Sequence, residues 1–540
     1  MNTARKWCAA LLALAMLAAC FPGLAEPPDG TPSASPADGE APPEMPDGET
    51  PPEMPDGETP PEMPDGEMPP EMPDGEMPPE MPDAEMPPEM PGDGGAAPGG
   101  DEDDYVLTGV LTVDGESAVY DGASDGDTLT SETGDENVVL AQNGASLILS
   151  NVVLNKTGDS SDANATDFYA VNAVVAAKSG STIELSDAIL ESAAVGANGL
   201  FASGEGSTLC ARNVAIHSSS DHSRGLDATY GGTVVADNLT IDTEGAHSAA
   251  AATDRGGGSI SIANSTLSTV GQGSPLIYST GTIEAIGVTG ESMGAQIAGM
   301  EGLNTVRLIR CDLTGSGNTA SEPLANGVLL YQSMSGDSSE GTALFEAVDS
   351  ALTSSIDGGA MFYVTNTSAE IVLENTALNF DSESNALIAV LGNDSNGWGT
   401  PGENGSTLKF TAIGEALSGD VVCDGISSAE LYLVSGTSWT GAAVRDETYA
   451  GDGGIAVNLS AGSTWIVTAD SELTSLSMPE GASIVDESGN AVTIIGTDGT
   501  VYVESDGEST VTVGSFTTND RTADAGAVSD PEIDRSGLEA

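Results

Sequence analysis

A short stretch of the chain places acidic, basic and tyrosine side chains among small residues. Asp254 and Arg255 interrupt a run of Ala, Thr, Ser and Gly, 25 positions after Thr229 and Tyr230. Tyrosine rings flanked by Asp and Arg can stack on sugar rings and hydrogen-bond to their hydroxyls. The candidate glycan-binding residues are Asp227, Tyr230, Asp254, Arg255, Tyr278 and Tyr331. In the alternative interpretation, Arg255 forms an ion pair with Asp227 or Asp254 across neighbouring repeats and no ligand is bound.

A second set of oxygen ligands lies in the segment "TGDSSDANATD", residues 157–167. Asp159, Asp162 and Asp167 are close enough in sequence to hold calcium, which prefers several carboxylate and carbonyl oxygens. The segment lacks the spacing of an EF-hand loop, so a solvated acidic loop is the alternative. No cofactor is expected from the sequence, apart from this candidate calcium site.

Histidine is rare, at 3 of 540 residues. His222 and His247 are 25 positions apart and are therefore expected to stack at a turn of neighbouring repeats. Two stacked imidazoles could share a metal, but without a third ligand a turn ladder is the simpler interpretation.

A regular repeat must position these residues. An Asn or a similar residue recurs three positions before an apolar residue that ends a strand, at Asn151, Asp187, Asn213, Asn238, Asn264, Gly287, Arg310, Asp349 and Asn375. Most steps are 23 to 26 residues, and the two longest, 36 and 39, contain polar insertions. Short alternating strands at this period predict a solenoid in which each repeat winds once and pairs in parallel with the next. Asn suits the fixed position because it tolerates a left-handed turn and because stacked amides hydrogen-bond to one another. The fold expected for residues 105–516 is an all-β, right-handed parallel β-helix formed by a single chain.

The stretches "STLCARNVAI", "GTVVADNLTI", "GSISIANSTL" and "SAEIVLENTAL" resemble the pectin-lyase-like right-handed β-helix superfamily, especially adhesin-like bacterial surface proteins. The resemblance covers roughly two thirds of the chain. It implies architecture rather than activity, since the superfamily includes lyases, hydrolases, tailspikes and adhesins. The motifs of a polygalacturonase-like hydrolase, "NTD", paired "DD", "GHG" and "RIK" in order, do not occur. Basic residues are too scarce, 13 Lys and Arg in all, to form the basic cluster of a pectate-lyase-like site.

The two ends of the chain differ from the repeats. Residues 1–25 are typical of a signal peptide, with "LAAC" up to Cys20 as an alternative lipidation site and "FPGLAE" as a cleavage site. Residues 26–104 hold 25 acids, no Lys or Arg, and nine-residue PPEMPDGE(T/M) repeats, which predict a disordered, extended stalk. The polar residues 517–540 are expected to be a disordered tail.

A formal charge of -71 disfavours nucleic acid as a partner, because phosphate binding needs clustered Lys and Arg. No apolar stretch is long enough for a membrane span, so an N-terminal lipid is the only expected membrane attachment. These features predict a secreted or cell-surface bacterial protein that acts without catalysis in adhesion or carbohydrate binding, with a polysaccharide or a cell-surface glycan as its partner. The alternatives are a polysaccharide lyase or glycoside hydrolase, and a structural rod without a ligand.

Overall fold

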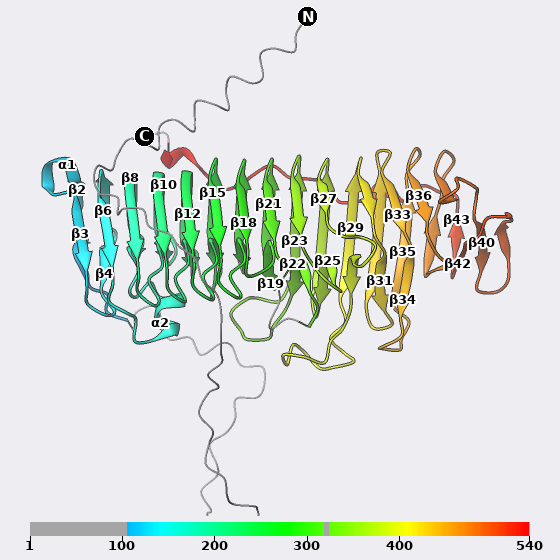
Figure 1. Cartoon of the computed structure of the whole chain (residues 1–540), viewed down its shortest axis with the longest axis horizontal. Helices are drawn as coiled ribbons and strands as arrows, with labels where there is room; N and C mark the ends of the chain where they lie inside the picture. Colours follow the sequence, from blue (N-terminus) through cyan, green and yellow to red (C-terminus); the bar gives the residue numbers. More distant parts are fainter. Residues whose placement is uncertain (1–104, 318–322, 539–540) are drawn as a thin grey trace, which may run out of the picture. The chain divides into compact units, whose positions relative to one another are not determined.

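A computed structural model describes residues 105–317 and 323–538. The chain winds as a parallel β-helix, as the repeat predicts (Figure 1). Strands pair in parallel with the strand one coil later; Thr208 to Arg212, for example, lie beside Thr233 to Asp237. The exception among the described strands is Val501–Val503, which pairs antiparallel with Thr493–Gly496. The predicted signal peptide, lipidation site and stalk lie outside the described residues.

One face of the β-helix is a sheet of thirteen strands in the described part of the chain. Its strands are β1 (Gly109–Asp114), β4 (Asn137–Gln142), β7 (Val175–Lys178), β9 (Leu200–Ser203), β11 (Leu226–Thr229), β13 (Ala251–Thr253), β16 (Ile277–Ser279), β19 (Ala298–Glu301), β22 (Asn326–Tyr331), β25 (Ala360–Thr365), β28 (Ala386–Val390), β31 (Val421–Asp424) and β34 (Ala443–Asp446). We call it the first face.

The second face follows the first in each coil. Its strands are β2 (Ser117–Asp121), β5 (Ser146–Ser150), β8 (Thr182–Ser192), β10 (Thr208–Ser218), β12 (Thr233–Thr243), β14 (Ser259–Ala263), β17 (Thr282–Ile286), β20 (Thr305–Ile309), β23 (Thr342–Val348), β26 (Ser368–Glu374), β29 (Thr407–Ile413), β32 (Ser428–Val434), β35 (Gly454–Leu459), β38 (Ser475–Ser477) and β43 (Phe516–Thr517).

The third face holds the later halves of β8, β10 and β12 and a row of shorter strands. These are β3 (Thr128–Ser131), β6 (Val153–Lys156), β15 (Thr266–Thr269), β18 (Thr289–Ser292), β21 (Asp312–Gly315), β24 (Ala351–Ser354) and β27 (Ala377–Asn379). A further sheet contains β30 (Ala416–Ser418), β33 (Ser438–Gly441), β36 (Thr464–Val467) and β39 (Ser483–Asp486), and another contains β37 (Ser471–Leu473), β40 (Thr493–Gly496), β41 (Val501–Val503) and β42 (Thr510–Val513). Two short helices, α1 (Gly122–Asp125) and α2 (Ala163–Phe168), lie outside the sheets.

The bend between the second and third faces falls on the residue that recurs in the sequence. All nine recurring positions have a positive φ, from 50° at Asn264 and Asp349 to 63° at Gly287. The predicted side-chain ladder forms in part, because Asn238 donates to Asn213 at 2.8 Å and Asn213 donates to Asp187 at 3.0 Å. The left-handed turn therefore recurs even where Arg310 replaces the amide, which shows that backbone geometry fixes the position and the ladder only reinforces it.

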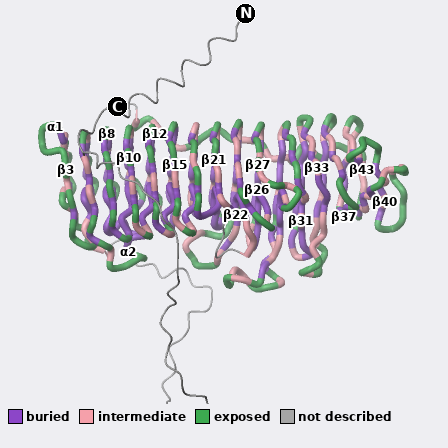
Figure 2. The backbone as a smooth tube through the Cα atoms, viewed as in Figure 1, coloured by how far each residue is buried: buried purple, intermediate pink, exposed green. Residues whose placement is uncertain are grey.

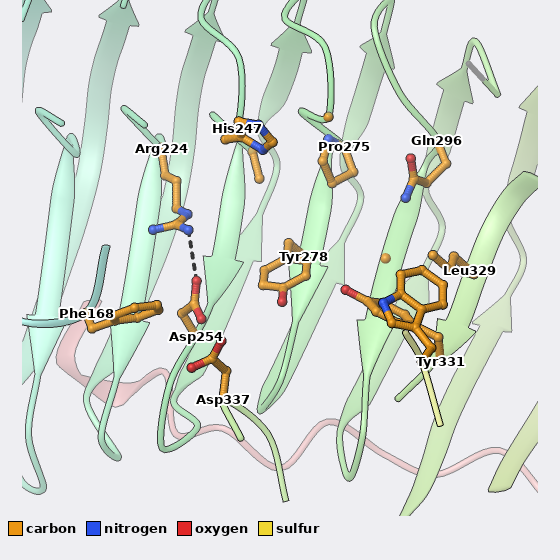
Figure 3. A pocket seen from close by; sticks show the side chains of 14 residues that line it. Phe168, Arg224, His247, Asp254, Pro275, Tyr278, Gln296, Leu329, Tyr331 and Asp337 are labelled. Carbon is orange, nitrogen blue, oxygen red and sulfur yellow. Dashed lines mark hydrogen bonds and ion pairs between the residues drawn. The ribbon is translucent and has the colours of Figure 1, made fainter. Parts of the chain in front are cut away.

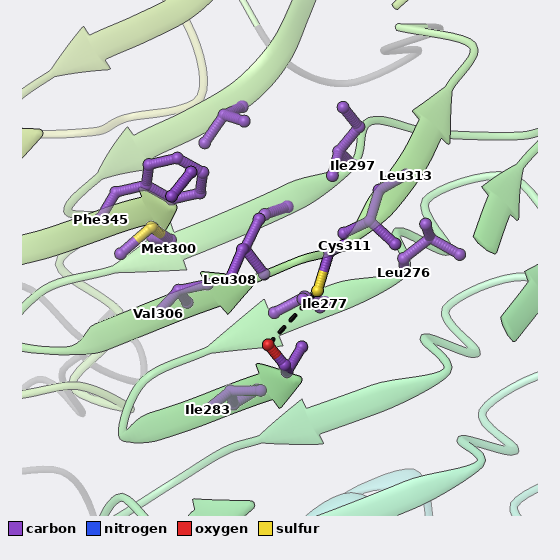
Figure 4. Close-up of a cluster of buried hydrophobic side chains, with 14 of the residues drawn as sticks. Leu276, Ile277, Ile283, Ile297, Met300, Val306, Leu308, Cys311, Leu313 and Phe345 are labelled. Atoms are coloured by element: carbon purple, nitrogen blue, oxygen red, sulfur yellow. Dashed lines mark hydrogen bonds between the residues drawn. The ribbon is translucent and has the colours of Figure 1, made fainter. Parts of the chain in front are cut away.

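Buried positions recur in successive coils (Figure 2). Apolar side chains at these positions form columns that run along the helix axis and fill the interior. One column continues through Leu209, Val234, Ile260, Ile283 and Val306, each of which is 0% exposed. Burying each such side chain contributes about 1.5–3 kcal/mol. Figure 4 shows part of this interior, in which the Cys311 thiol donates to the carbonyl of Ala285 at 3.3 Å. Cys210, Cys311 and Cys423 are free, buried thiols.

The structure corrects the prediction of a disordered tail over 517–540. Residues 518–538, which we call the C-terminal strap, run back from β43 toward β10 along the second face (Figure 1) and include the short helices η2 (Thr522–Asp524) and η3 (Ser536–Leu538). The strap covers an outward row of the second face, where Glu284, Arg307 and Glu346 are at most 5% exposed.

Backbone N–H groups hold the strap in place. Gly526 donates to Thr411 Oγ1 at 2.8 Å and Ser529 to Glu346 at 3.0 Å. Glu532 donates to Glu284 at 2.6 Å, and Arg307 lies between the two glutamates. Side chains of the strap add further polar contacts, such as that from Arg535 to Ser261 Oγ at 2.7 Å. The sequence prediction failed because the strap is held by polar contacts, so its side chains carry no apolar pattern. The sequence feature that could have indicated a covering segment is the charged residue at the centre of each of three strands, "TIEAI", "TVRLI" and "LFEAV".

Gly526 offers a direct test of the strap. A Cβ at this position would lie 2.6 Å from Glu370 Oε1 and 2.8 Å from Val372 Cγ2, so Gly526→Val is expected to unseat the strap. Amide hydrogen exchange over residues 525–538 should become at least about tenfold faster, since these amides would open to solvent. Ala527→Val is the matched control because Ala527 is exposed. Rapid exchange of these amides in the unaltered protein would contradict the docked strap.

Candidate functional site

A cavity of about 320 Å³ opens over the first face (Figure 3). It is lined by aromatic, charged and small side chains from five successive coils and from three inserted loops. The main lining residues are Phe168, Arg224, His247, Asp254, Pro275, Tyr278, Gln296, Gly299, Leu329, Tyr331, Asp337 and Trp398.

The floor of the cavity is one outward column of the first face. In register, Ala252 lies beside Tyr278, Tyr278 beside Gly299, and Gly299 beside Leu329. Gly299 leaves space above the sheet, because a Cβ there would have ordinary contacts of 3.4 Å to Gln296 Nε2 and 3.6 Å to Tyr278 Cδ2. The cavity therefore exists where a small residue stands between two large ones.

Insertions between strands supply the walls. Phe168 ends α2, within the polar insertion that lengthens the first long repeat. Asp337 lies in the connection between β22 and β23, and Trp398 in the connection between β28 and β29. These loops are excursions from a regular coil, so they can carry side chains over the sheet without disturbing its register.

Arg224 connects the acids of the site. It follows β10, is 8% exposed, and donates to Asp254 at 2.8 Å, to Asp227 at 3.0 Å and to Asp167 at 3.2 Å. One guanidinium thus faces three carboxyl groups from three different coils or loops. Figure 3 shows Arg224 reaching Asp254 beside Tyr278.

The three carboxyl groups titrate differently. Burial raises the pKa of Asp254 to about 7, although Arg224 acts in the opposite direction. Burial also raises the pKa of Asp227 well above its usual value. The pKa of Asp167 is lowered instead. Burial alone would raise it, but the charge of Arg224 and a hydrogen bond from His222 lower it by more. A carboxyl group that exchanges a proton near neutral pH therefore lines the cavity.

Arg255 has a different partner from either one predicted. Its guanidinium donates to Asp337 at 2.7 Å and lies 3.8 Å from the centre of the Phe168 ring. Asp227 and Asp254 pair with Arg224 instead, because Arg224 lies deeper between the coils. Arg255 therefore joins two of the inserted loops at the rim of the cavity.

Glu301 orients the two tyrosines of the cavity. It is 3% exposed and accepts hydrogen bonds from Tyr278 at 2.9 Å and from Tyr331 at 3.1 Å. The ring of Tyr331 lies 4.4 Å from that of Trp398, centroid to centroid. The paired rings present apolar faces beside the carboxyl groups.

Three of the six residues predicted to bind glycan line this cavity: Asp254, Tyr278 and Tyr331. The other three lie behind or beside it. Asp227 is 0% exposed under Arg224, Tyr230 stacks on Tyr169 with centroids 5.5 Å apart, and Arg255 holds Asp337. Sequence reasoning missed Arg224, Asp337, Trp398 and the space above Gly299. The length of the insertions was the only signal that pointed to the two loop residues.

The three aspartates predicted to bind calcium do not converge. Asp159 accepts from the Val195 N–H at 2.9 Å, Asp162 caps α2, and Asp167 pairs with Arg224 and His222. They separate because the acidic segment folds into α2 and directs its acids toward different coils.

The described residues contain one other cluster that could hold a cation. It consists of His217, Asp242 and Glu244, which offer ligand atoms within 4.8 Å of one another. The predicted stacking of His222 and His247 is confirmed, with ring centroids 5.3 Å apart.

The comparisons with known proteins identify no relative. No family model, no curated protein sequence and no solved structure matches this chain. Among the described residues, no helix is both long and apolar enough to cross a membrane.

Replacing Arg224 tests the buried ion cluster. Arg224→Met is expected to destabilise the protein by about 3–5 kcal/mol, because it leaves buried carboxyl groups without their cation. The measurement is the unfolding midpoint in denaturant, with the exposed Arg310→Met as the control. The decrease in the free energy of unfolding should be smaller at pH 5 than at pH 8.

In the variant, the pKa values of Asp227 and Asp254 are higher in the folded state than in the unfolded state. The folded state therefore binds more protons, and the stability of the variant falls as pH rises. An equal loss at both pH values would contradict this account.

Proposed function

We propose that this chain is an exported bacterial cell-surface protein whose β-helix binds carbohydrate, without catalysis, in adhesion. The observation that carries the proposal is the cavity over Gly299, where aromatic faces and carboxyl groups meet. Ligand sites in proteins combine such apolar walls with a few polar groups that fix orientation. A pyranose ring offers the matching surfaces, an apolar face and a rim of hydroxyls.

The aromatic and polar groups lie in suitable places for this role. Tyr331 and Trp398 are half-buried, so their rings are held by the protein and still reachable. Asp337 has a side chain that is 20% exposed and can accept hydrogen bonds from sugar hydroxyls. Held rings lose little entropy on binding, which favours affinity.

Features of the sequence support the location at the cell surface. The leader over residues 1–25 supports export, and Cys20 offers an N-terminal lipid. The diacyl modification of a lipoprotein would matter, because a single acyl chain binds membranes only marginally. The acidic segment over 26–104 would then hold the β-helix away from the membrane, toward an extracellular polysaccharide or a host glycan.

A glycan-array screen tests the proposal. The full chain should retain a defined glycan, with and without calcium, and Gly299→Leu should abolish retention because the new side chain fills the cavity. Trp398→Ala should weaken binding at least about tenfold, the loss expected for a stacked ring. Tyr502→Ala is the matched control, since Tyr502 is an exposed aromatic residue outside the cavity.

Two other results of the glycan-array screen would contradict carbohydrate binding in this cavity. Retention that is unchanged in Gly299→Leu would place binding elsewhere and contradict the proposal. No retention on any glycan would leave a structural surface rod as the better description.

Glycoside hydrolysis is the second candidate, and a specific observation favours it. Asp254, whose pKa burial raises to about 7, lines the same cavity as Asp337, and an Arg side chain contacts each of them. Hydrolases of glycosides use a protonated and an ionised carboxyl group on either side of the bond they cleave. Release of new reducing ends from a retained glycan, lost in Asp254→Asn, would establish hydrolysis in place of binding alone.

A further inference from the structure

The cavity is surrounded by an excess of carboxyl groups. Five of them, Asp167, Asp227, Asp254, Glu301 and Asp337, line it or contact the residues that do. Arg224 and Arg255 are the two guanidinium groups in the same shell. The other titratable groups of this shell are His247, which lines the cavity, and His222, which contacts Asp167. Acidic side chains therefore outnumber the two guanidinium groups and the two imidazoles together.

Both guanidinium groups are already occupied by the protein. Arg224 donates to three carboxyl groups, and its side chain is only 10% exposed. Arg255 bonds to Asp337 and covers the Phe168 ring. An anionic sugar such as a uronate would bring a further carboxylate next to Asp254 and Asp337, and like charges repel. Asp254 and Asp337 are held in the same ion pairs, but a carboxylate has about four acceptor sites and can accept a further hydrogen bond without losing its arginine.

The same arrangement suits a cation with an apolar surface. Aromatic rings attract cations through their faces, and Tyr278, Tyr331 and Trp398 line the cavity together with Asp254 and Asp337. An ammonium group can donate up to three hydrogen bonds, and a hydrogen bond between charged groups is stronger than one between neutral groups. The formal charge of -71 over the whole chain also attracts cations to the surface.

We propose that the cavity binds a glycan through an amino sugar whose amine is free rather than acetylated. Its ring packs against the pair formed by Tyr331 and Trp398, and its ammonium group lies between the carboxyl groups of Asp254 and Asp337. An N-acetyl group would remove the positive charge and enlarge the substituent. This inference rests on the proposed carbohydrate-binding function and specifies the class of sugar.

The test compares short oligosaccharides that differ in charge. Isothermal titration of the full chain at pH 7 is run with the β-1,4 trimers of glucosamine, N-acetylglucosamine and glucose and with the α-1,4 trimer of galacturonate. The glucosamine trimer is expected to bind at least about tenfold more tightly than its N-acetylated form, the value of one charge-assisted hydrogen bond. The galacturonate trimer should not bind.

Variants distinguish binding in the cavity from general electrostatic attraction of a cation to an acidic protein. Gly299→Leu should abolish binding of the glucosamine trimer. Asp254→Asn should remove most of the preference over the N-acetylated trimer, because the amide keeps its shape but loses its charge. Asp452→Asn removes an equal charge from an exposed position in the connection between β34 and β35 and should leave the preference unchanged.

Three results would overturn the inference. If the neutral or N-acetylated trimer binds as tightly as glucosamine and Gly299→Leu abolishes this, the proposed carbohydrate binding stands and the amino-sugar preference fails. If choline binds as tightly as the glucosamine trimer and competes with it, the cavity recognises an amine and not a sugar. If no trimer binds in a way that depends on Gly299, both proposals fail.

Discussion

The structure depends on the hydrogen bonds between successive coils. Successive coils pair in parallel, so a strand residue lies directly beside the strand residue one repeat later. A coil cannot bury its apolar face alone, and the pairing with its neighbours closes the core. The left-handed residue at each bend keeps this register, since a slip of one position would turn apolar side chains outward. Any position in a paired strand is therefore also a position in a column.

The site follows from this constraint. Because the columns are fixed, a cavity can form only where a column holds a small residue or where a loop leaves the coil. Gly299 provides the first condition, and the loops that carry Phe168, Asp337 and Trp398 provide the second. Arg224 then ties acids from neighbouring coils and from α2 together. The cluster holds the inserted segment against the regular coils at a cost in desolvation that its hydrogen bonds offset.

The sequence was informative wherever a residue acts through its column. The bend residues from Asn151 to Asn375, the stacking of His222 on His247 and the alignment of Asp254 with the preceding coil all follow from the period, and the structure confirms them. The sequence was uninformative where contacts join segments that have no fixed spacing along the chain. Arg255 meets Asp337 across 82 residues, and the strap meets Glu284 across more than 240. Such pairings depend on how loops fold back, which periodicity does not encode.

The central claim is that the cavity over the first face is where this protein meets its ligand. A crystal structure of the full chain soaked with the glucosamine trimer tests it most directly. The account predicts a sugar ring over Tyr331 and Trp398, with its polar groups within hydrogen-bonding distance of Asp254 and Asp337. A sugar bound on another face of the β-helix, with this cavity unchanged, would contradict it.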